Sequence, residues 1–303
     1  MSVPAPRGQV YELPVPRGQT RAALTALRPR QWSKNLLLFA GILFAAKLGD
    51  AMRWLEALTA FVAYCAASSA AYLVNDVVDA PYDRLHPVKR SRPVARGELS
   101  AHAAFVLAAA LTGVALALVV PLGLWSFGFL LGFLLLQAAY SLRLKHVVLI
   151  DVMAIGALFV VRAAAGAQAV DVRISPWLLL CTALLALFLG FAKRRGELVL
   201  VGAAEAPGRP VLEGYSLALV DQLISVVAAS TVIAYSLYTF TARDSKAMMA
   251  TIPFVLFGLF RYLLLMHRQD LGEEPEQVLF TDAPILVAIA LWAFTSGLIL
   301  ALY

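Results

Sequence analysis

Long apolar runs alternate with short polar segments along the chain, and nine of these runs have the composition of membrane-spanning helices. About 20 mainly apolar residues cross a bilayer as a helix, and backbone groups in lipid must be hydrogen-bonded within their own segment. The first and sixth runs are shorter, which predicts tilted spans or a locally thinned bilayer. No run alternates with a period of two residues, so a β-barrel is not expected. The predicted spans are Asn35–Leu48, Trp54–Val74, Ala101–Val120, Leu122–Leu142, Val147–Val170, Pro176–Phe191, Leu217–Phe240, Met248–Met266 and Asp282–Tyr303.

The composition is that of an all-α polytopic membrane protein. Of 303 residues, 61% are hydrophobic and 15% are charged, with a mean hydropathy of +0.79, whereas about a quarter of the residues of a soluble domain are charged. Residues 1–20 lack the apolar core of a signal peptide, so we predict a disordered cytoplasmic tail there. Residues 21–303 are predicted to form a single transmembrane domain. Cys65 and Cys181 lie far apart in apolar runs, where cysteine acts as a small hydrophobic residue.

The positions of lysine and arginine predict the orientation of the chain. If the N-terminus is cytoplasmic, 18 of these cations fall on cytoplasmic segments and 5 on the opposite side. Cytoplasmic loops carry the excess of positive charge, so this split predicts a cytoplasmic N-terminus and an outside C-terminus. The net charge of +6 follows from these loops and favours anionic lipid surfaces. No nucleic-acid-binding motif accompanies it.

The run NDVVDAPYD at the end of the second span places several carboxylates beside an apolar helix. A carboxylate at the centre of a membrane helix costs about 2.5–3.5 kcal/mol, and less at its edge, so a cluster of three indicates function. Asn75, Asp79 and Asp83 are spaced to share one helix face, and their oxygens are ligands that suit Mg²⁺. Pro81 predicts that the helix kinks or ends before Asp83. The alternative is a structural role in helix capping and interfacial solvation.

Cations and a second polar patch lie near these carboxylates in the predicted topology. The patch follows the fourth span, and both loops open to the same side, so Lys145 is a candidate for binding phosphate and Asp151 for orienting it or holding a metal. Solvation at the interface is the simpler account of His146, and an interfacial aromatic belt that of Tyr140. The cations after the first motif are Arg84, Lys89, Arg90, Arg92 and Arg96, and the patch contains Tyr140, Arg143, Lys145, His146 and Asp151.

Other charged positions leave two interpretations open. Arg162 and Arg261 lie within spans, where a cation usually faces a cavity or a partner. Lys193 and Arg194 end the sixth span, where they either bind phosphate or stabilise a helix C-terminus. The run RPRQWSKN precedes the first span and suits a lipid headgroup phosphate or a general membrane anchor. The acidic patch Glu274, Glu276 and Asp282 is either functional or a solvated loop.

Together these segments resemble the UbiA superfamily of intramembrane prenyltransferases. NDVVDAPYD matches N-D-x-x-D-x-x-x-D, the first motif of that superfamily, at every fixed position. The second motif usually has two Asp residues four apart, whereas here Asp151 stands alone and position 155 is isoleucine. RPRQWSKN, YSLRLKH, RAAAGA and AKRRGEL are similar to the decaprenyl-phosphate phosphoribosyltransferase branch, although Ala283 replaces an expected basic residue. The similarity extends from about Arg28 to the last span.

The resemblance implies a function and a set of site residues. It implies about nine helices around a central cavity that opens to the cytoplasmic side of a bacterial inner membrane. The reaction implied is Mg²⁺-dependent transfer of 5-phosphoribosyl from phosphoribosyl diphosphate to a polyprenyl (decaprenyl) phosphate, with release of diphosphate. The lipid-linked product would be used in cell wall biosynthesis. Membrane lipids are expected partners, and a homo-oligomer is compatible with the sequence. The implied catalytic residues are Asp76, Asp79 and Asp83; the metal ligands Asn75, Asp79 and Asp83; the donor phosphate-binding residues Lys89, Arg90, Arg92, Tyr140, Lys145, Asp151, Arg162, Lys193 and Arg194; and the acceptor-binding residues Arg28, Gln31, Trp32 and Lys34.

Two alternative functions stay open at this point. An aromatic or haem prenyltransferase of the same superfamily would use a prenyl diphosphate donor, and the complete first motif suits it. The single Asp of the second motif and the run RPRQWSKN argue against that choice. A non-catalytic lipid carrier or transporter would also place charges in spans, but commonly with paired halves and interrupted helices near the midplane. Dependence of turnover on a metal ion separates an enzyme from a carrier.

Overall fold

Helices account for every regular element in the computed structural model, which describes residues 18–44, 49–85, 89–201, 210–241, 246–269, 278 and 281–302. No strand occurs within these residues. The α-helices are α1 Gln19–Ala26, α2 Ala40–Phe44, α3 Ala51–Asp83, α4 Ala101–Val119, α5 Leu124–Leu142, α6 Ile150–Ala169, α7 Pro176–Val201, α8 Leu217–Thr241, α9 Ile252–Gln269 and α11 Ala283–Leu302. Short 3₁₀ helices connect them: η1 Pro29–Phe39, η2 Lys89–Ser91, η3 Val120–Leu122, η4 Leu144–His146, η5 Pro210–Gly214 and η6 Lys246–Thr251.

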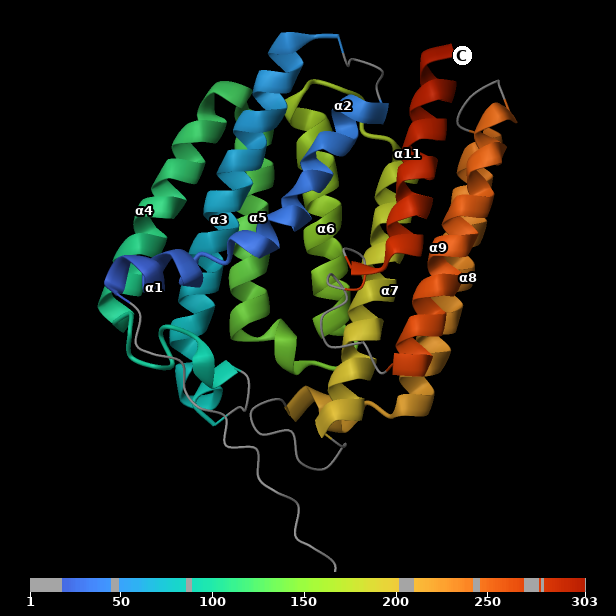
Figure 1. Cartoon of the computed structure of the whole chain (residues 1–303). Helices are drawn as coiled ribbons and strands as arrows, with labels where there is room; N and C mark the ends of the chain where they lie inside the picture. Colours follow the sequence, from blue (N-terminus) through green and yellow to red (C-terminus); the bar gives the residue numbers. More distant parts are fainter. Residues whose placement is uncertain are drawn as a thin grey trace, which may run out of the picture.

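The helices run up and down in one bundle, as Figure 1 shows. Neighbours along the chain pack together: α3 with α4, α5 with α6, α6 with α7, α7 with α8, and α9 with α11. In the described part of the chain, seven helical segments are long and apolar enough to cross a membrane, and Ala283–Ile299 is a shorter apolar helix. The all-α membrane fold is therefore confirmed, whereas the count of nine spans stays a prediction.

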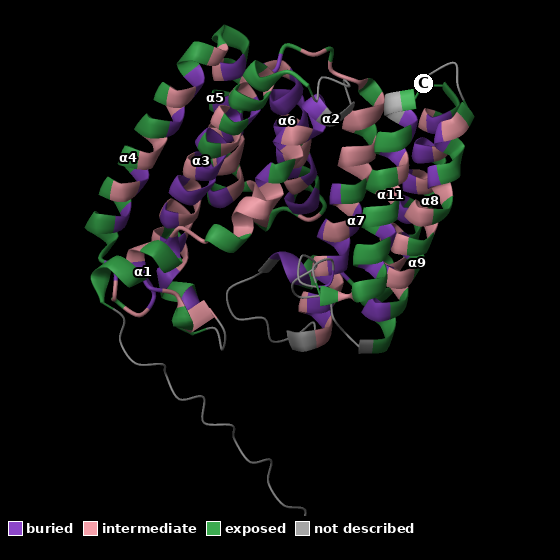
Figure 2. Ribbon diagram, turned by 45° about the horizontal axis from the view of Figure 1, so that its top comes forward, coloured by how far each residue is buried: buried purple, intermediate pink, exposed green. Residues whose placement is uncertain are grey.

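Burial differs sharply among the helices (Figure 2). Small residues such as Ala63, Ala67 and Ala163 pack with no or almost no exposure, and they make α3 and α6 the most enclosed of the spans. The outer faces of the bundle carry exposed apolar side chains, among them Trp125 and Phe294. Exposed apolar surface on this scale is unusual for a soluble monomer and is what acyl chains can cover.

Helix α3 is longer than the predicted span and contains the whole first motif. It begins at an Asp50 cap, whose carboxylate accepts hydrogen bonds from the backbone N–H groups of Met52 and Arg53 at 3.0 and 3.3 Å. The helix continues through Pro81 to Asp83. The prediction that it ends before Asp83 and leaves that residue in a loop is therefore wrong. Pro81 lies in the last turn, where it disturbs few backbone bonds.

Three other predicted boundaries change. Helix α7 continues to Val201, so Lys193 and Arg194 lie inside a helix and not at its end. The first predicted span, Asn35–Leu48, is a 3₁₀ segment followed by the five-residue α2, and residues 45–48 lie outside the described residues. Helix α1 begins at Gln19, inside the predicted tail 1–20, of which residues 1–17 are outside the described part. Glu274 and Glu276 of the predicted acidic patch also lie outside it.

Candidate active site

The last turns of α3 carry four polar side chains on one arc of the helix. Successive residues turn by about 100°, so Asn75, Asp79, Asp83 and Asp76 follow one another across an arc of roughly 100°. Asn75 donates a hydrogen bond to Asp79 at 2.8 Å, and both are half-buried. Asp76 and Asp83 are buried. The cluster therefore divides into an Asn75–Asp79 pair and an Asp76–Asp83 pair.

Lys145 from η4 reaches the first pair. Its Nζ lies 2.6 Å from Asp79 Oδ1 and 3.4 Å from Asn75 Oδ1. The α3–α4 and α5–α6 connections therefore meet at the same end of the bundle, which confirms the prediction made from the alternation of spans. A cation from η4 and a carboxylate from α3 are held where a phosphate and a metal ion would each find a partner.

Two arginines neutralise the second pair. Arg92 Nη1, from the loop after η2, lies 2.6 Å from Asp83 Oδ2 and 3.3 Å from Asp76 Oδ1. The Arg28 guanidinium also donates to Asp76 Oδ1. Arg28 has a left-handed backbone with φ of 52°, and the turn is fixed nearby because Trp32 donates to Ser69, which donates to the carbonyl of Leu27. Trp32 thus positions Arg28.

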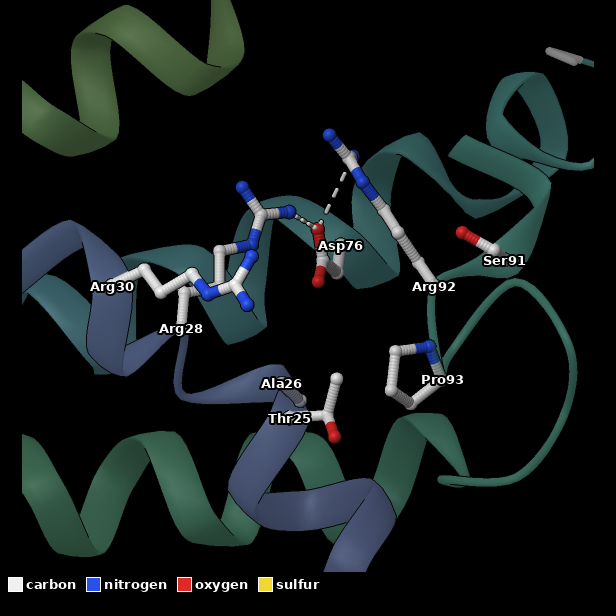
Figure 3. A pocket seen from close by; sticks show the side chains of 8 residues that line it. All are labelled: Thr25, Ala26, Arg28, Arg30, Asp76, Ser91, Arg92 and Pro93. Atoms are coloured by element: carbon white, nitrogen blue, oxygen red, sulfur yellow. Dashed lines mark hydrogen bonds and ion pairs between the residues drawn. The ribbon is translucent and has the colours of Figure 1, made fainter. Parts of the chain in front are cut away.

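A pocket of about 370 Å³ opens beside Asp76 (Figure 3). Within the described residues, Asp76 Oδ2 is buried and has no hydrogen-bond partner. Arg30, which is not among the predicted site residues, contributes its side chain to this wall and lies two positions after Arg28 in the same basic run. The lining residues are Thr25, Ala26, Arg28, Arg30, Asp76, Ser91, Arg92 and Pro93.

Asp151 belongs to a separate buried network. It is fully buried, accepts a hydrogen bond from Arg194 Nε at 2.6 Å, and accepts another from the Tyr215 hydroxyl at 2.7 Å. Arg194, also fully buried, pairs in addition with Glu197. Burial and the hydrogen bond to Asp151 raise the pKa of Tyr215 well above its usual value. No feature of the sequence pointed to Tyr215.

Arg162 lies apart from the acidic cluster. It is buried, about three turns along α6 from Asp151. Its Nε donates to Asn35 Oδ1 at 2.9 Å, and its guanidinium stacks at 4.7 Å from the Phe133 ring centre. These contacts tie η1 to α6, and the predicted role of Arg162 in donor binding stays a prediction.

The remaining predicted site residues lie in η2, α5, α7 and η1. Lys89 and Arg90 form η2, Tyr140 is in the last turn of α5, and Lys193 is half-buried in α7. Gln31 and Lys34 are half-buried in η1. Their predicted roles stay predictions.

The donor set fits a metal ion that shares its ligands with a substrate. No group of three His, Cys, Asp or Glu side chains among the described residues is arranged to hold a metal by itself. Mg²⁺ commonly takes only one or two carboxylates and completes its shell with water and phosphate oxygens. Asp79, with the neighbouring Asn75 oxygen, and the unpartnered Asp76 Oδ2 supply oxygen ligands of this kind.

Comparison with known proteins identifies the family. The model of the UbiA prenyltransferase family matches residues 36–283. The chain belongs to this family. The UbiA chain is 32% identical to a decaprenyl-phosphate phosphoribosyltransferase of Mycolicibacterium smegmatis over 93% of each chain. It is 30% identical to the protein of that name from Corynebacterium glutamicum, over 95% of this chain and 89% of the relative.

The fold of this UbiA protein matches solved structures. A UbiA homolog from Archaeoglobus fulgidus bound to GPP and Mg²⁺ superposes with a TM-score of 0.71 at 19% identity, covering 93% of this chain and 100% of that one. The resemblance carried by NDVVDAPYD and RPRQWSKN is confirmed. The chain is an integral membrane transferase of the UbiA family.

Proposed function

We propose that this UbiA protein transfers 5-phosphoribosyl from phosphoribosyl diphosphate to a polyprenyl phosphate and releases diphosphate. The observation that carries the proposal is the convergence of Asp76, Asp79 and Asp83 with Arg28, Arg92 and Lys145 at one end of the bundle. The names of the relatives, which align along nearly the whole chain, support this choice of donor and acceptor. We place the site on the cytoplasmic side of a bacterial plasma membrane, because the positive charges gather there.

Carboxylates and cations would divide the work on the leaving group. Asn75, Asp79 and Asp83, with Asp76 beside them, would hold Mg²⁺, which supplies charge neutralisation for the departing diphosphate. Lys145 lies against Asp79 and would donate to the diphosphate oxygens, while Arg92, against Asp83, is placed to donate to another phosphate group of the substrates. Preorganised donors aimed at a developing negative charge are usually the largest single contribution to rate.

The acceptor needs little chemical activation. An oxygen of the lipid phosphate attacks C1 of the ribose while the bond from C1 to the diphosphate oxygen breaks. The attacking phosphate is already an anion, so no proton has to be removed and no general base is required. Arg28, Gln31, Trp32 and Lys34 would hold this phosphate while the isoprenoid chain lies along the helices. Positioning of the two phosphate-bearing groups then contributes much of the acceleration.

The state of Asp151 favours this donor over a prenyl diphosphate. In the superfamily the second motif usually provides a pair of Asp residues, but here Asp151 is fully buried and engaged by Arg194 and Tyr215. Both oxygens of Asp151 already accept a hydrogen bond, Oδ2 from Arg194 and Oδ1 from Tyr215, so a partner must be displaced before either can bind a metal ion. Asp76, in contrast, keeps an oxygen without a partner in the described part of the chain. The second motif therefore supports the structure of the α5–α6 loop.

A turnover assay on detergent-purified protein tests the proposal. Mg²⁺, polyprenyl phosphate and radiolabelled phosphoribosyl diphosphate are supplied, and label is expected in the organic phase and lost with EDTA. Product formed instead from a prenyl diphosphate and 4-hydroxybenzoate would assign the chain to the aromatic branch. No product in either assay from folded protein would contradict an enzymatic role and favour a carrier.

Asp79→Asn keeps the size of the side chain and removes its charge. We expect turnover at limiting Mg²⁺ to fall on the order of 100-fold, with partial recovery at high Mg²⁺. Asp171→Asn is the matched control, because Asp171 is exposed and follows the C-terminal end of α6. The acidic cluster lies near the N-terminal end of α6. Full activity of Asp79→Asn or Asp83→Ala at limiting Mg²⁺ would rule out the metal assignment.

A further inference from the structure

The pocket beside Asp76 carries an excess of positive charge. Three of its lining residues are arginines, Arg28, Arg30 and Arg92, and Asp76 is the single carboxylate among them. Guanidinium groups stay protonated in proteins, so the lining residues alone carry about +2. Asp83 pairs with Arg92 from outside the wall and lowers the local excess to about +1. Thr25 and Ser91 add hydroxyl groups to the wall (Figure 3). A phosphate monoester carries a charge of about −1.5 to −2 at neutral pH, opposite in sign to this excess.

Asp76 holds two of the arginines in place before any ligand arrives. Its Oδ1 accepts from both Arg28 and Arg92, and Asp83 fixes Arg92 from a second direction. The two guanidinium groups come from segments far apart in the sequence, so the buried carboxylate is what brings them to one pocket. Arginine forks that are already oriented lose less freedom when they bind a phosphate.

Arg30 differs from its two neighbours. It is exposed at the pocket wall, and within the described part of the chain its guanidinium has no carboxylate partner. Asp76 and Asp83 neutralise Arg28 and Arg92, so the excess positive charge of the pocket is that of Arg30. An arginine in this position can form two parallel hydrogen bonds to a phosphate at little expense to the fold.

We infer that Arg28, Arg30 and Arg92 form a phosphate monoester subsite, separate from the Asn75–Asp79–Lys145 face where the diphosphate would lie. The inference rests on the proposed function, whose two substrates both carry such a group: the donor at its 5-position and the acceptor at the end of its lipid chain. Asp76 and Asp79 are three residues apart on α3, which puts their Cβ atoms about 5–6 Å apart. The two phosphate regions are therefore close enough to serve one pentose.

Arg30→Gln tests the subsite without leaving a buried carboxylate unpaired. Loss of one charge-assisted contact to phosphate raises the relevant KM by at least about tenfold. A rise in the KM of phosphoribosyl diphosphate alone assigns the 5-phosphate, and a rise in the KM of polyprenyl phosphate alone assigns the lipid. Arg30→Lys, which keeps the charge without the fork, is expected to recover part of the effect. Arg21→Gln on α1 is the matched control, because Arg21 is exposed and does not line the pocket. Unchanged KM values in Arg30→Gln would overturn the inference.

A binding measurement keeps the subsite test separate from catalysis. Ribose 5-phosphate, with EDTA present, is expected to raise the Tm of the wild-type protein in detergent, whereas ribose is not, and the shift should be lost in Arg30→Gln. Farnesyl phosphate in place of ribose 5-phosphate tests the lipid phosphate as the source. If wild-type protein turns over the proposed substrates but neither ligand shifts its Tm in an Arg30-dependent way, the subsite is wrong and the proposed function stands. If either ligand shifts the Tm in an Arg30-dependent way but no turnover occurs, the subsite stands and the proposed function is wrong.

Discussion

Tyr215 is the residue that fixes the start of α6 and hence the loop that presents Lys145. Its hydroxyl donates to Asp151 and accepts the backbone N–H of Leu149, each at 2.7 Å. Leu149 has a positive φ of 67°, which is strained for a leucine. A hydrogen bond to that residue compensates part of the strain and holds the chain between Lys145 and Asp151 in one conformation.

Tyr215→Phe removes both hydrogen bonds while keeping the ring. We expect a loss of about 1–3 kcal/mol in the free energy of unfolding, because Asp151 Oδ1 is left buried without this donor, together with a lower kcat as Lys145 becomes less well held. Thermal unfolding and steady-state kinetics measure the two effects. Since the raised pKa keeps the phenol protonated in the folded state, the stability difference should be constant below about pH 9 and shrink only at more alkaline pH.

Tyr64→Phe is the control for Tyr215→Phe. The Tyr64 hydroxyl is buried and has no hydrogen-bond partner in the described part of the chain, so its removal should leave stability unchanged or slightly higher. Equal losses in the two variants would mean that the Tyr215 hydrogen bonds contribute nothing specific.

At the residue scale, charged residues beside apolar runs could be predicted as site residues from the sequence. Residues whose role depends on contacts with distant segments, such as Tyr215, could not. The carboxylates of α3 stood out because charge beside an apolar run is unfavourable without a function. Lys145 could be paired with them from the alternation of spans alone. Which carboxylate pairs with which cation, and that Asp151 faces Arg194 and Tyr215, depend on side-chain contacts between distant segments, which spacing along the chain does not specify.

The backbones of helix α6 and of the segment η1–α2 are in direct contact, and two glycines make this close packing possible. A Cβ added to Gly166 would lie 2.2 Å from the carbonyl oxygen of Leu38, and one on Gly41 would lie 2.7 Å from the Cα of Ala167. Both atoms belong to the backbone, so they cannot move aside as the end of a flexible side chain could. Because η1 follows directly from Arg28 and contains Arg30, this contact also determines where those arginines lie.

Gly166→Ala is expected to destabilise the fold by about 1–3 kcal/mol, since η1 must move away from α6. It should also raise the KM of the substrate whose phosphate Arg30 binds. Gly113→Ala in α4 is the control: nothing lies within 4 Å of its added Cβ, so alanine should be neutral or stabilise the helix by up to about 1 kcal/mol. A Gly166→Ala protein with wild-type Tm and kinetics would contradict the close contact.

Asp282 joins α11 to α9 and caps α11. It accepts the backbone N–H of Ile285 at 3.0 Å and pairs with both Nε and Nη2 of Arg261 at 3.3 and 2.9 Å. This gives Arg261 an identified partner, and it places Asp282, one member of the predicted acidic patch, in a structural role. The hydrogen bond from Arg261 lowers the pKa of Asp282, which lies just before the apolar part of α11.

Asp282→Asn keeps the helix cap and removes the ion pair. A lowered pKa in the folded state means that the carboxylate stabilises the fold above its unfolded pKa of about 3.9, and that this contribution is lost as the pH falls through the folded value. We therefore expect a modest loss of Tm that is constant above about pH 5 and disappears in stronger acid. A double-mutant cycle with Arg261→Gln measures the coupling, and additive losses would contradict it.

The long helices α3 to α9 were predictable from hydropathy, whereas their ends were not, and the first predicted span proved to be a 3₁₀ segment with a short helix. The end of the apolar run at Val74 coincides with the point where α3 starts to carry polar groups, yet the helix continues for more than two turns to Asp83. The same holds in α7, where Arg194 pairs with Asp151 and Arg195 lies 2.8 Å from Asp221. Partners on neighbouring helices stabilise charged residues in a helix, and a single sequence does not reveal those partners.

The whole molecule has two chemically different ends. The end of α3, Lys145 and α1 lie at one end of the bundle, and the C-terminal end of α11 lies at the other (Figure 1). Connections at the first end carry the excess of Lys and Arg, which is the basis for placing the site in the cytoplasm.

Cysteine labelling tests this orientation. Glu213→Cys, exposed in η5, should be protected from a membrane-impermeant maleimide in intact cells and react after lysis, whereas Leu124→Cys, at the opposite end, should react in both. A Cys181→Ala background removes the half-buried native thiol, and Cys65 is buried. The reverse labelling pattern would put the site outside the cell.

The ion pairs of the site impose a thermodynamic linkage between its ligands. Lys145 lies against Asp79, and Arg92 against Asp76 and Asp83, so cations of the protein itself neutralise these carboxylates. Lys145 can turn to a phosphate oxygen at little expense only when another cation replaces it at Asp79. The factor by which a divalent cation strengthens phosphate binding must then equal the factor by which phosphate strengthens cation binding. An affinity for the donor therefore has meaning only at a stated concentration of that cation.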